Sequence, residues 1–245
     1  MQLLCGAALV STAAFAAVFF NRKMKRHDFY RFLINFIYPN ICPCCGKIIG
    51  YNDAFCVECA ETFEASTASV KIEYADDFAA FCVYDGNASR LVTHFKNDPC
   101  GNSAYAFAYG IFRAVSEKDL AKYVDEIVYI PMTRADYDRR GYNQTELIAR
   151  ELHFMMNVPY QNALVKRRRT RHQKELSGEE RKRNVTGVFA AAEGLRFDGK
   201  SVLIIDDVCT TGSTLSDAAR ALREAGAERV FAAAFAKTQI LPRNS

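Results

Sequence analysis

An apolar run that ends in two adjacent carboxylates and a loop of small, hydroxylated residues constrains this 245-residue chain most strongly. The run is Val202–Ile205, the carboxylates are Asp206 and Asp207, and the loop continues to Thr214. Unbroken apolar residues are typical of a strand that is buried on both faces, as in a parallel sheet. The two carboxylates therefore fall at the carboxyl end of a strand, where open α/β sheets bind their ligands.

The segment after these carboxylates predicts a phosphate site. Thr214 can cap a helix that ends at Gly226, and Glu228–Lys237 supplies the next strand. Backbone N–H groups, hydroxyls and a helix N-terminus would converge on the loop, which is the arrangement that holds a phosphate. An ordinary turn that only caps a helix is the alternative, but it leaves the paired carboxylates unexplained. A nucleotide P-loop is excluded because Gly-Lys-Ser/Thr is absent.

Four of the nine cysteines are spaced like the ligands of a structural zinc ion. Cys42 and Cys45 form one C-x2-C pair, and Cys56 and Cys59 form a second pair after a ten-residue spacer. Two such pairs complete a tetrahedral Zn²⁺ site with no open position. The alternatives are two disulfides, which a cytosolic setting disfavours, and a redox-active pair, which would need a thioredoxin-like βαβ pattern around it. Cys44 is interpreted as a bystander.

Two basic segments are candidates to bind a second anionic group besides the phosphate at the loop. Met132–Gln144 is predicted to be a loop after a strand at 124–131, and it contains Arg140 beside Gly, Asn and Gln. Arginine makes bidentate contacts with phosphate oxygens, and glycine lets the backbone approach them. The segment 165–183 holds ten Lys, Arg or His side chains, including Arg167. It predicts a solvated face, a nucleic-acid surface or a loop that closes over an anionic ligand.

The first twenty residues are almost entirely apolar. Leu3–Phe20 is about as long as a membrane span, and basic residues follow it, which would place the body of the chain in the cytoplasm. A membrane anchor is therefore one interpretation, and a mis-assigned start with translation beginning at Met24 is the other. A signal peptide is disfavoured because no basic residues precede the apolar run.

Taken in order, these motifs resemble the ComF family of phosphoribosyltransferase-like competence proteins. The similarity covers residues from about Phe32 to Lys237, and the Arg140–Gln144 and Asp206–Thr214 blocks are its specific parts. The resemblance implies an α/β fold: a type I phosphoribosyltransferase-like core with a central parallel sheet, preceded by a small zinc-ribbon module. The predicted divisions are a hydrophobic head at 1–23, the four-cysteine module at 24–64 and the phosphoribosyltransferase-like domain at 78–240.

The resemblance also implies a ligand, phosphoribosyl pyrophosphate (PRPP), bound with Mg²⁺. Asp206 and Asp207 would be the catalytic acids that contact the ribose hydroxyls and the metal. Arg140 is the candidate for the pyrophosphate, and Arg167 begins a candidate lid. The loop would hold the 5′-phosphate through Thr210, Thr211, Gly212, Ser213 and Thr214.

Several functions remain open on this resemblance. One is an enzyme that transfers the phosphoribosyl group to an unknown acceptor and releases pyrophosphate. Another is a non-catalytic PRPP-binding scaffold or sensor in DNA uptake, acting through protein partners such as the competence helicase. A DNA-binding accessory factor is the third. The expected location is the cytoplasm, with membrane association through residues 3–20 if the chain starts at Met1.

Overall fold

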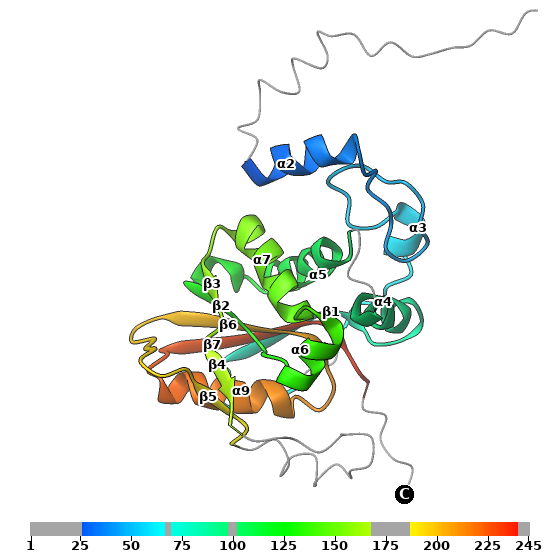
Figure 1. Cartoon of the computed structure of the whole chain (residues 1–245). Helices are drawn as coiled ribbons and strands as arrows, with labels where there is room; N and C mark the ends of the chain where they lie inside the picture. The colour runs from blue at the N-terminus through cyan, green and yellow to red at the C-terminus, as the bar shows by residue number, and fades with distance from the viewer. Residues whose placement is uncertain (1–25, 67–69, 98–101, 168–186, 240–245) are drawn as a thin grey trace, which may run out of the picture.

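The computed structural model describes residues 26–66, 70–97, 102–167 and 187–239, and its centre is a sheet of five parallel strands (Figure 1). The strand order is β1-β7-β6-β2-β3, so the strand that carries the paired carboxylates lies in the middle. The parallel sheet predicted from the unbroken apolar run is confirmed. The strands are β1 (Asp77–Val83), β2 (Glu126–Tyr129), β3 (Tyr160–Gln161), β6 (Ser201–Cys209) and β7 (Arg229–Lys237).

Helices cover both faces of this sheet. Figure 1 shows α4, α5 and α7 on one face and α9 on the other, where a two-stranded antiparallel sheet of β4 and β5 accompanies α9. Each face has its own apolar core, and β6 contributes alternate side chains to the two cores. The bounds are α4 (Gly86–Asn97), α5 (Ser103–Glu117), η1 (Ala121–Tyr123), α6 (Arg134–Arg140), α7 (Gln144–Met156), β4 (Leu164–Lys166), β5 (Phe189–Ala191) and α9 (Ser213–Glu224).

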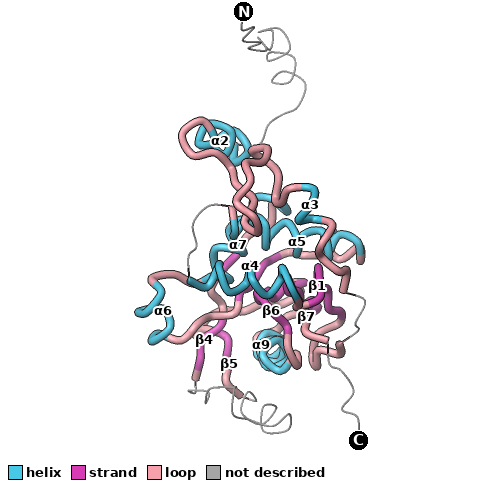
Figure 2. The backbone as a smooth tube through the Cα atoms, turned by 90° about the vertical axis from the view of Figure 1, so that its right-hand side faces the viewer, coloured by secondary structure: helices cyan, strands magenta, loops and turns pink. Residues whose placement is uncertain are grey.

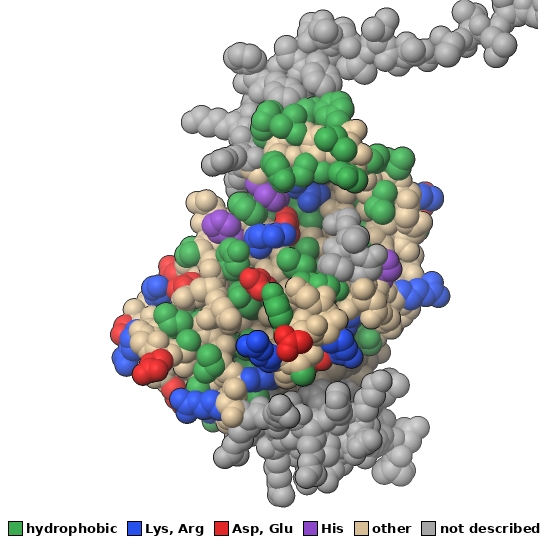
Figure 3. All heavy atoms as spheres, viewed as in Figure 1, with side chains coloured by type: hydrophobic (Ala, Val, Ile, Leu, Met, Phe, Trp, Pro, Cys, Tyr) green, Lys and Arg blue, Asp and Glu red, His purple; other side chains and the backbone are tan. Residues whose placement is uncertain are grey.

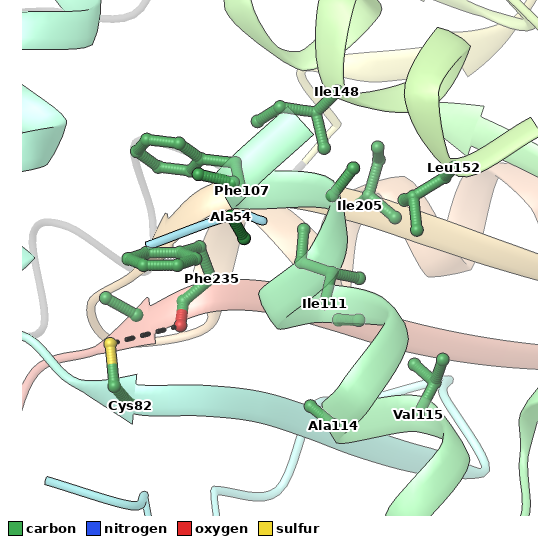
Figure 4. Packing of buried hydrophobic residues seen from close by; sticks show 14 of the residues in the cluster. Ala54, Cys82, Phe107, Ile111, Ala114, Val115, Ile148, Leu152, Ile205 and Phe235 are labelled. Carbon is green, nitrogen blue, oxygen red and sulfur yellow. Dashed lines mark hydrogen bonds between the residues drawn. The ribbon is translucent and has the colours of Figure 1, made fainter. Parts of the chain in front are cut away.

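Aromatic packing joins α5 to the sheet. The rings of Phe107 and Phe235 lie 4.4 Å apart between centroids (Figure 4). Gly110 makes this approach feasible, because a Cβ atom there would lie 2.8 Å from the Phe235 ring. Phe107 is fully buried at this contact and fixes α5 against the sheet.

The N-terminal module sits at the α4/α5 end of the domain (Figure 2). It contains α2 (Arg26–Asn35) and α3 (Val57–Ala60). The amide of Asn102 donates to the carbonyls of Asp53 and Ala54, and the Phe63 ring packs edge-on against Phe235 at 5.8 Å. The module therefore shares the core of the larger domain on that face of the sheet.

Exposed apolar side chains gather over α2, as the space-filling view shows (Figure 3). Phe29, Tyr30, Leu33 and Ile34 are each more than a third exposed. The predicted hydrophobic head at 1–23 lies outside the described residues. Among the residues that the structure does describe, none of the helices is long and apolar enough to span a membrane.

Candidate ligand site and candidate metal centre

The two carboxylates of β6 point to opposite faces of the sheet. Neighbouring side chains alternate along a strand. Ile204 belongs to the core under α9, and Ile205 belongs to the core under α5 and α7. Asp206 therefore faces the α9 side and Asp207 faces the α4 side. The backbone fixes both groups further, because each carboxylate accepts the N–H of the next residue at 2.8 Å.

A lysine from α4 meets the second carboxylate. Lys96 Nζ lies 2.8 Å from Asp207 Oδ2, and the two side chains are 36% and 14% exposed. Burial alone would lower the pKa of Lys96, but the charge and hydrogen bond of Asp207 outweigh burial and raise that pKa. Burial and the charge of Asp207 raise the pKa of Asp206 well above its ordinary value. The site therefore holds one ion-paired carboxylate beside one that resists ionisation.

A second lysine, Lys166 of β4, lies within range of the charges of Asp136 and Asp206. Burial lowers the pKa of Lys166, while the charges of Asp136 and Asp206 act in the opposite direction. Asp217 of α9 anchors the β4–β5 strand pair that carries Lys166. The carboxylate of Asp217 accepts the N–H group of Phe189 in β5 and that of Gly187 just before it, at 2.7 Å each. Lys96 lies in no predicted motif, and only a tertiary contact brings it to Asp207. Lys166, in contrast, belongs to the basic segment 165–183 that the sequence marks as a candidate anion-binding segment.

The helix that follows the candidate phosphate loop, α9, has a different N-cap residue from the one predicted. The helix begins at Ser213 and its N-cap is Gly212, whose φ of +80° lies in the left-handed region. The prediction of Thr214 as the cap is therefore wrong, since Thr214 lies inside the first turn. The left-handed Gly212 turns the chain at an earlier residue, and the hydroxyls of Thr211 and Ser213 lie 2.8 Å apart at the helix entrance.

A buried lysine supports this loop from β7. Lys237 is 1% exposed, and its Nζ donates to the carbonyls of Thr210 at 2.9 Å and Thr238 at 2.7 Å. Burial lowers the pKa of Lys237. The amine thus ties the end of β7 to the loop and brings a basic group beneath a candidate anion site.

The arginine segment is partly helical, which corrects the predicted loop at Met132–Gln144. Residues 134–140 form α6 because Thr133 caps it: its hydroxyl accepts the N–H of Asp136 at 3.1 Å and donates to that carboxylate at 2.7 Å. Gly141, at φ +79°, ends the helix. Arg140 lies in the last turn and donates to Gln144 Oε1 at 3.2 Å. Gln144 is buried, and its amide nitrogen lacks a hydrogen-bond partner among the described residues.

The loop after α6 reaches the lysine end of α4. Tyr142 donates its hydroxyl proton to the carbonyl of Phe95 at 2.9 Å. Arg140 and Lys96 therefore come from segments that are joined directly. Arg167, in contrast, is exposed at the end of β4 and bonds through its backbone N–H to Val188. The rest of the basic segment predicted as a lid, residues 168–183, lies outside the described residues.

The four cysteines of the two C-x2-C pairs come together in the N-terminal module. The sulfur atoms of Cys42, Cys45, Cys56 and Cys59 all lie within 4.8 Å of one another, and all four are free thiols. Cys45 and Cys56 sulfurs are 3.6 Å apart. Four sulfurs at about 2.3 Å from a tetrahedral ion lie roughly 3.8 Å apart, whereas a disulfide needs about 2.05 Å. The cluster therefore fits a tetrahedral metal ion.

Backbone donors prepare one of these thiols for deprotonation. Burial would raise the pKa of Cys42, but the N–H groups of Cys56, Cys44 and Cys45 point to its sulfur and lower the pKa to about 7. Thiolate sulfur is the form that binds metal. Cys44, between the ligand candidates, is different, since burial raises its pKa to about 12.

Comparison with known proteins shows that most of the candidate ligand site falls within a known domain. Residues 138–242 match the model of the phosphoribosyl transferase domain. This range holds the end of α6, the whole of β6, the loop and α9. Lys96 and the four cysteines lie outside it. The class that the fold and site define is therefore a phosphoribosyltransferase-like protein.

Within this class, the chain is similar to curated proteins named for competence or DNA utilization. Competence protein F of Haemophilus influenzae is 35% identical over 111 residues, 44% of this chain and 48% of that protein. DNA utilization protein YhgH of Escherichia coli is 36% identical over 107 residues, 43% and 46% of the two chains. Competence protein ComFC of Bacillus subtilis is 29% identical over 100 residues, 41% and 39%. The aligned part thus spans about half or less of each relative, and it confirms the resemblance to the ComF family.

Solved structures with a similar fold include the purine phosphoribosyltransferase of Pyrococcus horikoshii, at 21% identity and a TM-score of 0.34. The similarity covers 55% of this chain and 78% of that one. An allosteric regulatory enzyme of purine biosynthesis matches at 24% identity and a TM-score of 0.31, over 45% and 21% of the two chains. At these scores the similarity adds nothing to the description of the site.

Proposed function

We propose that this protein binds PRPP with Mg²⁺ at the carboxyl end of β6. The observation that carries the proposal is the acid pair of the central strand, followed directly by the hydroxyl-rich loop that opens α9. The ligand has a phosphate, a ribose with free hydroxyls and a pyrophosphate. The site offers a helix N-terminus for the phosphate, two carboxylates for the hydroxyls and the metal ion, and cationic side chains for the pyrophosphate.

Each part of the ligand has a proposed partner. Asp206 and Asp207 take the ribose hydroxyls and the metal ion, since Mg²⁺ prefers carboxylate and phosphate oxygens. Arg140 takes the pyrophosphate, and Arg167 remains a candidate at the entrance. The 5′-phosphate is assigned to the loop residues Thr210, Thr211, Gly212, Ser213 and Thr214.

The chemistry proposed for the site is phosphoribosyl transfer. The bond between C1 and the pyrophosphate oxygen breaks, and its electron pair leaves with the pyrophosphate. A nitrogen nucleophile of the acceptor forms the new bond to C1 and loses its proton. Positive charge develops on the sugar while negative charge develops on the leaving group, so the protein contributes chiefly by positioning and electrostatic stabilisation.

A non-catalytic role is the second candidate, and the names of the relatives favour it. Competence protein F and DNA utilization protein YhgH are named for DNA uptake or use. A PRPP-binding scaffold or sensor that acts in the cytoplasm through protein partners, such as the competence helicase, fits such a setting. A DNA-binding accessory role remains an alternative for the basic segment.

The four cysteines are proposed to hold a structural Zn²⁺. Their sulfur cluster leaves no position for a substrate in a tetrahedral site, so the ion would stabilise the module and take no part in chemistry. Because the module shares a core with α5 and Phe235, loss of the ion is expected to weaken the packing of the larger domain as well.

Calorimetry with PRPP and Mg²⁺ tests the binding proposal. The wild type is expected to bind, and Asp207→Asn is expected to lose at least tenfold in affinity because a charged ligand to Mg²⁺ becomes neutral. Lys118→Met, in an exposed pair with Asp77, is the matched control and should bind as the wild type does. Pyrophosphate release with candidate bases then separates the two roles. Binding without release for any acceptor favours the scaffold, and no binding of PRPP overturns both.

A further inference from the structure

The ion pair between Lys96 and Asp207 fills the position that a ligand would need. Asp207 Oδ1 accepts the N–H of Val208 at 2.8 Å, and Oδ2 is paired with Lys96 Nζ at the same distance. Each oxygen of this carboxylate therefore already has a partner. A metal ion or a ribose hydroxyl that binds Asp207 has to share Oδ2 with the ammonium or displace it.

Electrostatics favours displacement when the ligand carries Mg²⁺. A divalent ion and an ammonium group repel each other at contact distance, and a single carboxylate oxygen does not offset that repulsion. Lysine carries a compact charge on a flexible stem with rotatable donors, so its amine can move between two anions without a change in the helix. With its side chain 36% exposed, Lys96 has space to do so.

A hydrogen bond joins the end of α4, which carries Lys96, to the segment that carries Arg140, the proposed pyrophosphate partner. Lys96 follows Phe95, whose carbonyl accepts the hydroxyl of Tyr142 at 2.9 Å. Tyr142 lies two residues after Arg140 along the chain. The end of α4 and the arginine segment are thus held together, and Lys96 at that end meets Asp207.

We propose that Lys96 is a ligand-binding residue with two positions: it neutralises Asp207 in the empty site and moves to the pyrophosphate of PRPP when the ligand binds. The proposal rests on the PRPP function above and extends it to a residue outside the phosphoribosyl transferase domain match. It also gives α4 a role in the site.

Three probes distinguish this role from a purely structural one: PRPP, inorganic pyrophosphate and ribose 5-phosphate, each titrated with Mg²⁺ into the full chain. Lys96→Met removes the charge and keeps most of the stem. It is expected to weaken PRPP and pyrophosphate by roughly tenfold or more, as the loss of a charge-assisted hydrogen bond predicts. Ribose 5-phosphate, which lacks the pyrophosphate, should bind as before or more tightly. Lys96→Arg should restore most of the PRPP affinity.

Two outcomes overturn the proposal while leaving PRPP binding intact. One is an equal loss of PRPP and ribose 5-phosphate affinity in Lys96→Met, which would mean that Lys96 acts only by placing Asp207. The other is unchanged affinity for all three probes. If Lys96→Met does not fold, as judged by its melting curve, Lys96→Gln is measured against the same three probes under the same criteria. A wild type that binds pyrophosphate but not PRPP overturns the proposed function first.

Discussion

Substitution of Gly212 by alanine tests how tightly the candidate phosphate loop is built. The residue sits at φ +80°, where an L-residue costs about 1–2 kcal/mol. The new Cβ would also lie 2.5 Å from Ile72 Cδ1 and 3.3 Å from Val70 Cγ1. Ile72 is only 3% exposed, so it has little room to move away. Overpacking of this kind adds about 1–2 kcal/mol.

The two costs together lower the free energy of unfolding of Gly212→Ala by about 2–4 kcal/mol. For a chain of this length that is a drop of about 4–16 °C in melting temperature. Gly199→Ala is the matched control, because Gly199 has φ +72° and no atom lies within 4 Å of the point where its Cβ would stand. It should show the backbone cost alone. Thermal and urea unfolding of both variants measure the difference.

A second substitution separates the clash from the backbone strain. Ile72→Val deletes the Cδ1 atom that alanine would meet, and by itself costs about 0.5–1.5 kcal/mol. In the double variant Gly212→Ala/Ile72→Val, the two losses should fall short of additivity by about 1–2 kcal/mol, since the steric part is relieved. Additive losses, or a Gly212→Ala loss no larger than that of Gly199→Ala, would refute the packing argument.

Three other consequences follow from the site and the module. The raised pKa of Asp206 means that the folded state favours its protonated form, so this stability is present at low pH and is lost as pH rises through the raised pKa. At pH 7 the free energy of unfolding of Asp206→Asn, measured by urea titration, should therefore exceed that of the wild type by about 1 kcal/mol or more, with little difference near pH 4. PRPP binding by the same variant should weaken at least tenfold. Equal stability of the two proteins at pH 7 would contradict this expectation. Cys59→Ser should lose bound zinc by elemental analysis and melt lower, whereas Cys44→Ser keeps one zinc per chain; zinc-free wild type would exclude the metal proposal. Lys237→Met should weaken binding of PRPP and of ribose 5-phosphate together, because its amine supports the loop at Thr210, and an unchanged affinity for both would rule out that support.

Local sequence patterns predict the central strand of this protein and the loop and helix that follow it. The unbroken apolar run of β6, the two carboxylates at its end and the hydroxyl loop are adjacent in sequence, so their spacing alone predicts a strand, a turn and a helix with a ligand at the strand end. The cysteine pairs are also predictable from local sequence, because each C-x2-C turn brings two sulfur atoms close together. The structure adds that the two pairs meet within 4.8 Å.

Tertiary structure decided which charges surround the carboxylates. Lys96 of α4 pairs with Asp207, and Lys166 of β4 lies within range of the charge of Asp206, although neither lies near the carboxylates in sequence. Sequence spacing does not predict such contacts, because parallel strands are joined by long crossovers that bring distant segments to one sheet edge. The loop at Gly212 shows the same limit on a smaller scale. Its hydroxyl residues predicted a cap at Thr214, whereas the left-handed Gly212 caps the helix, and Ile72 leaves no room there for a side chain.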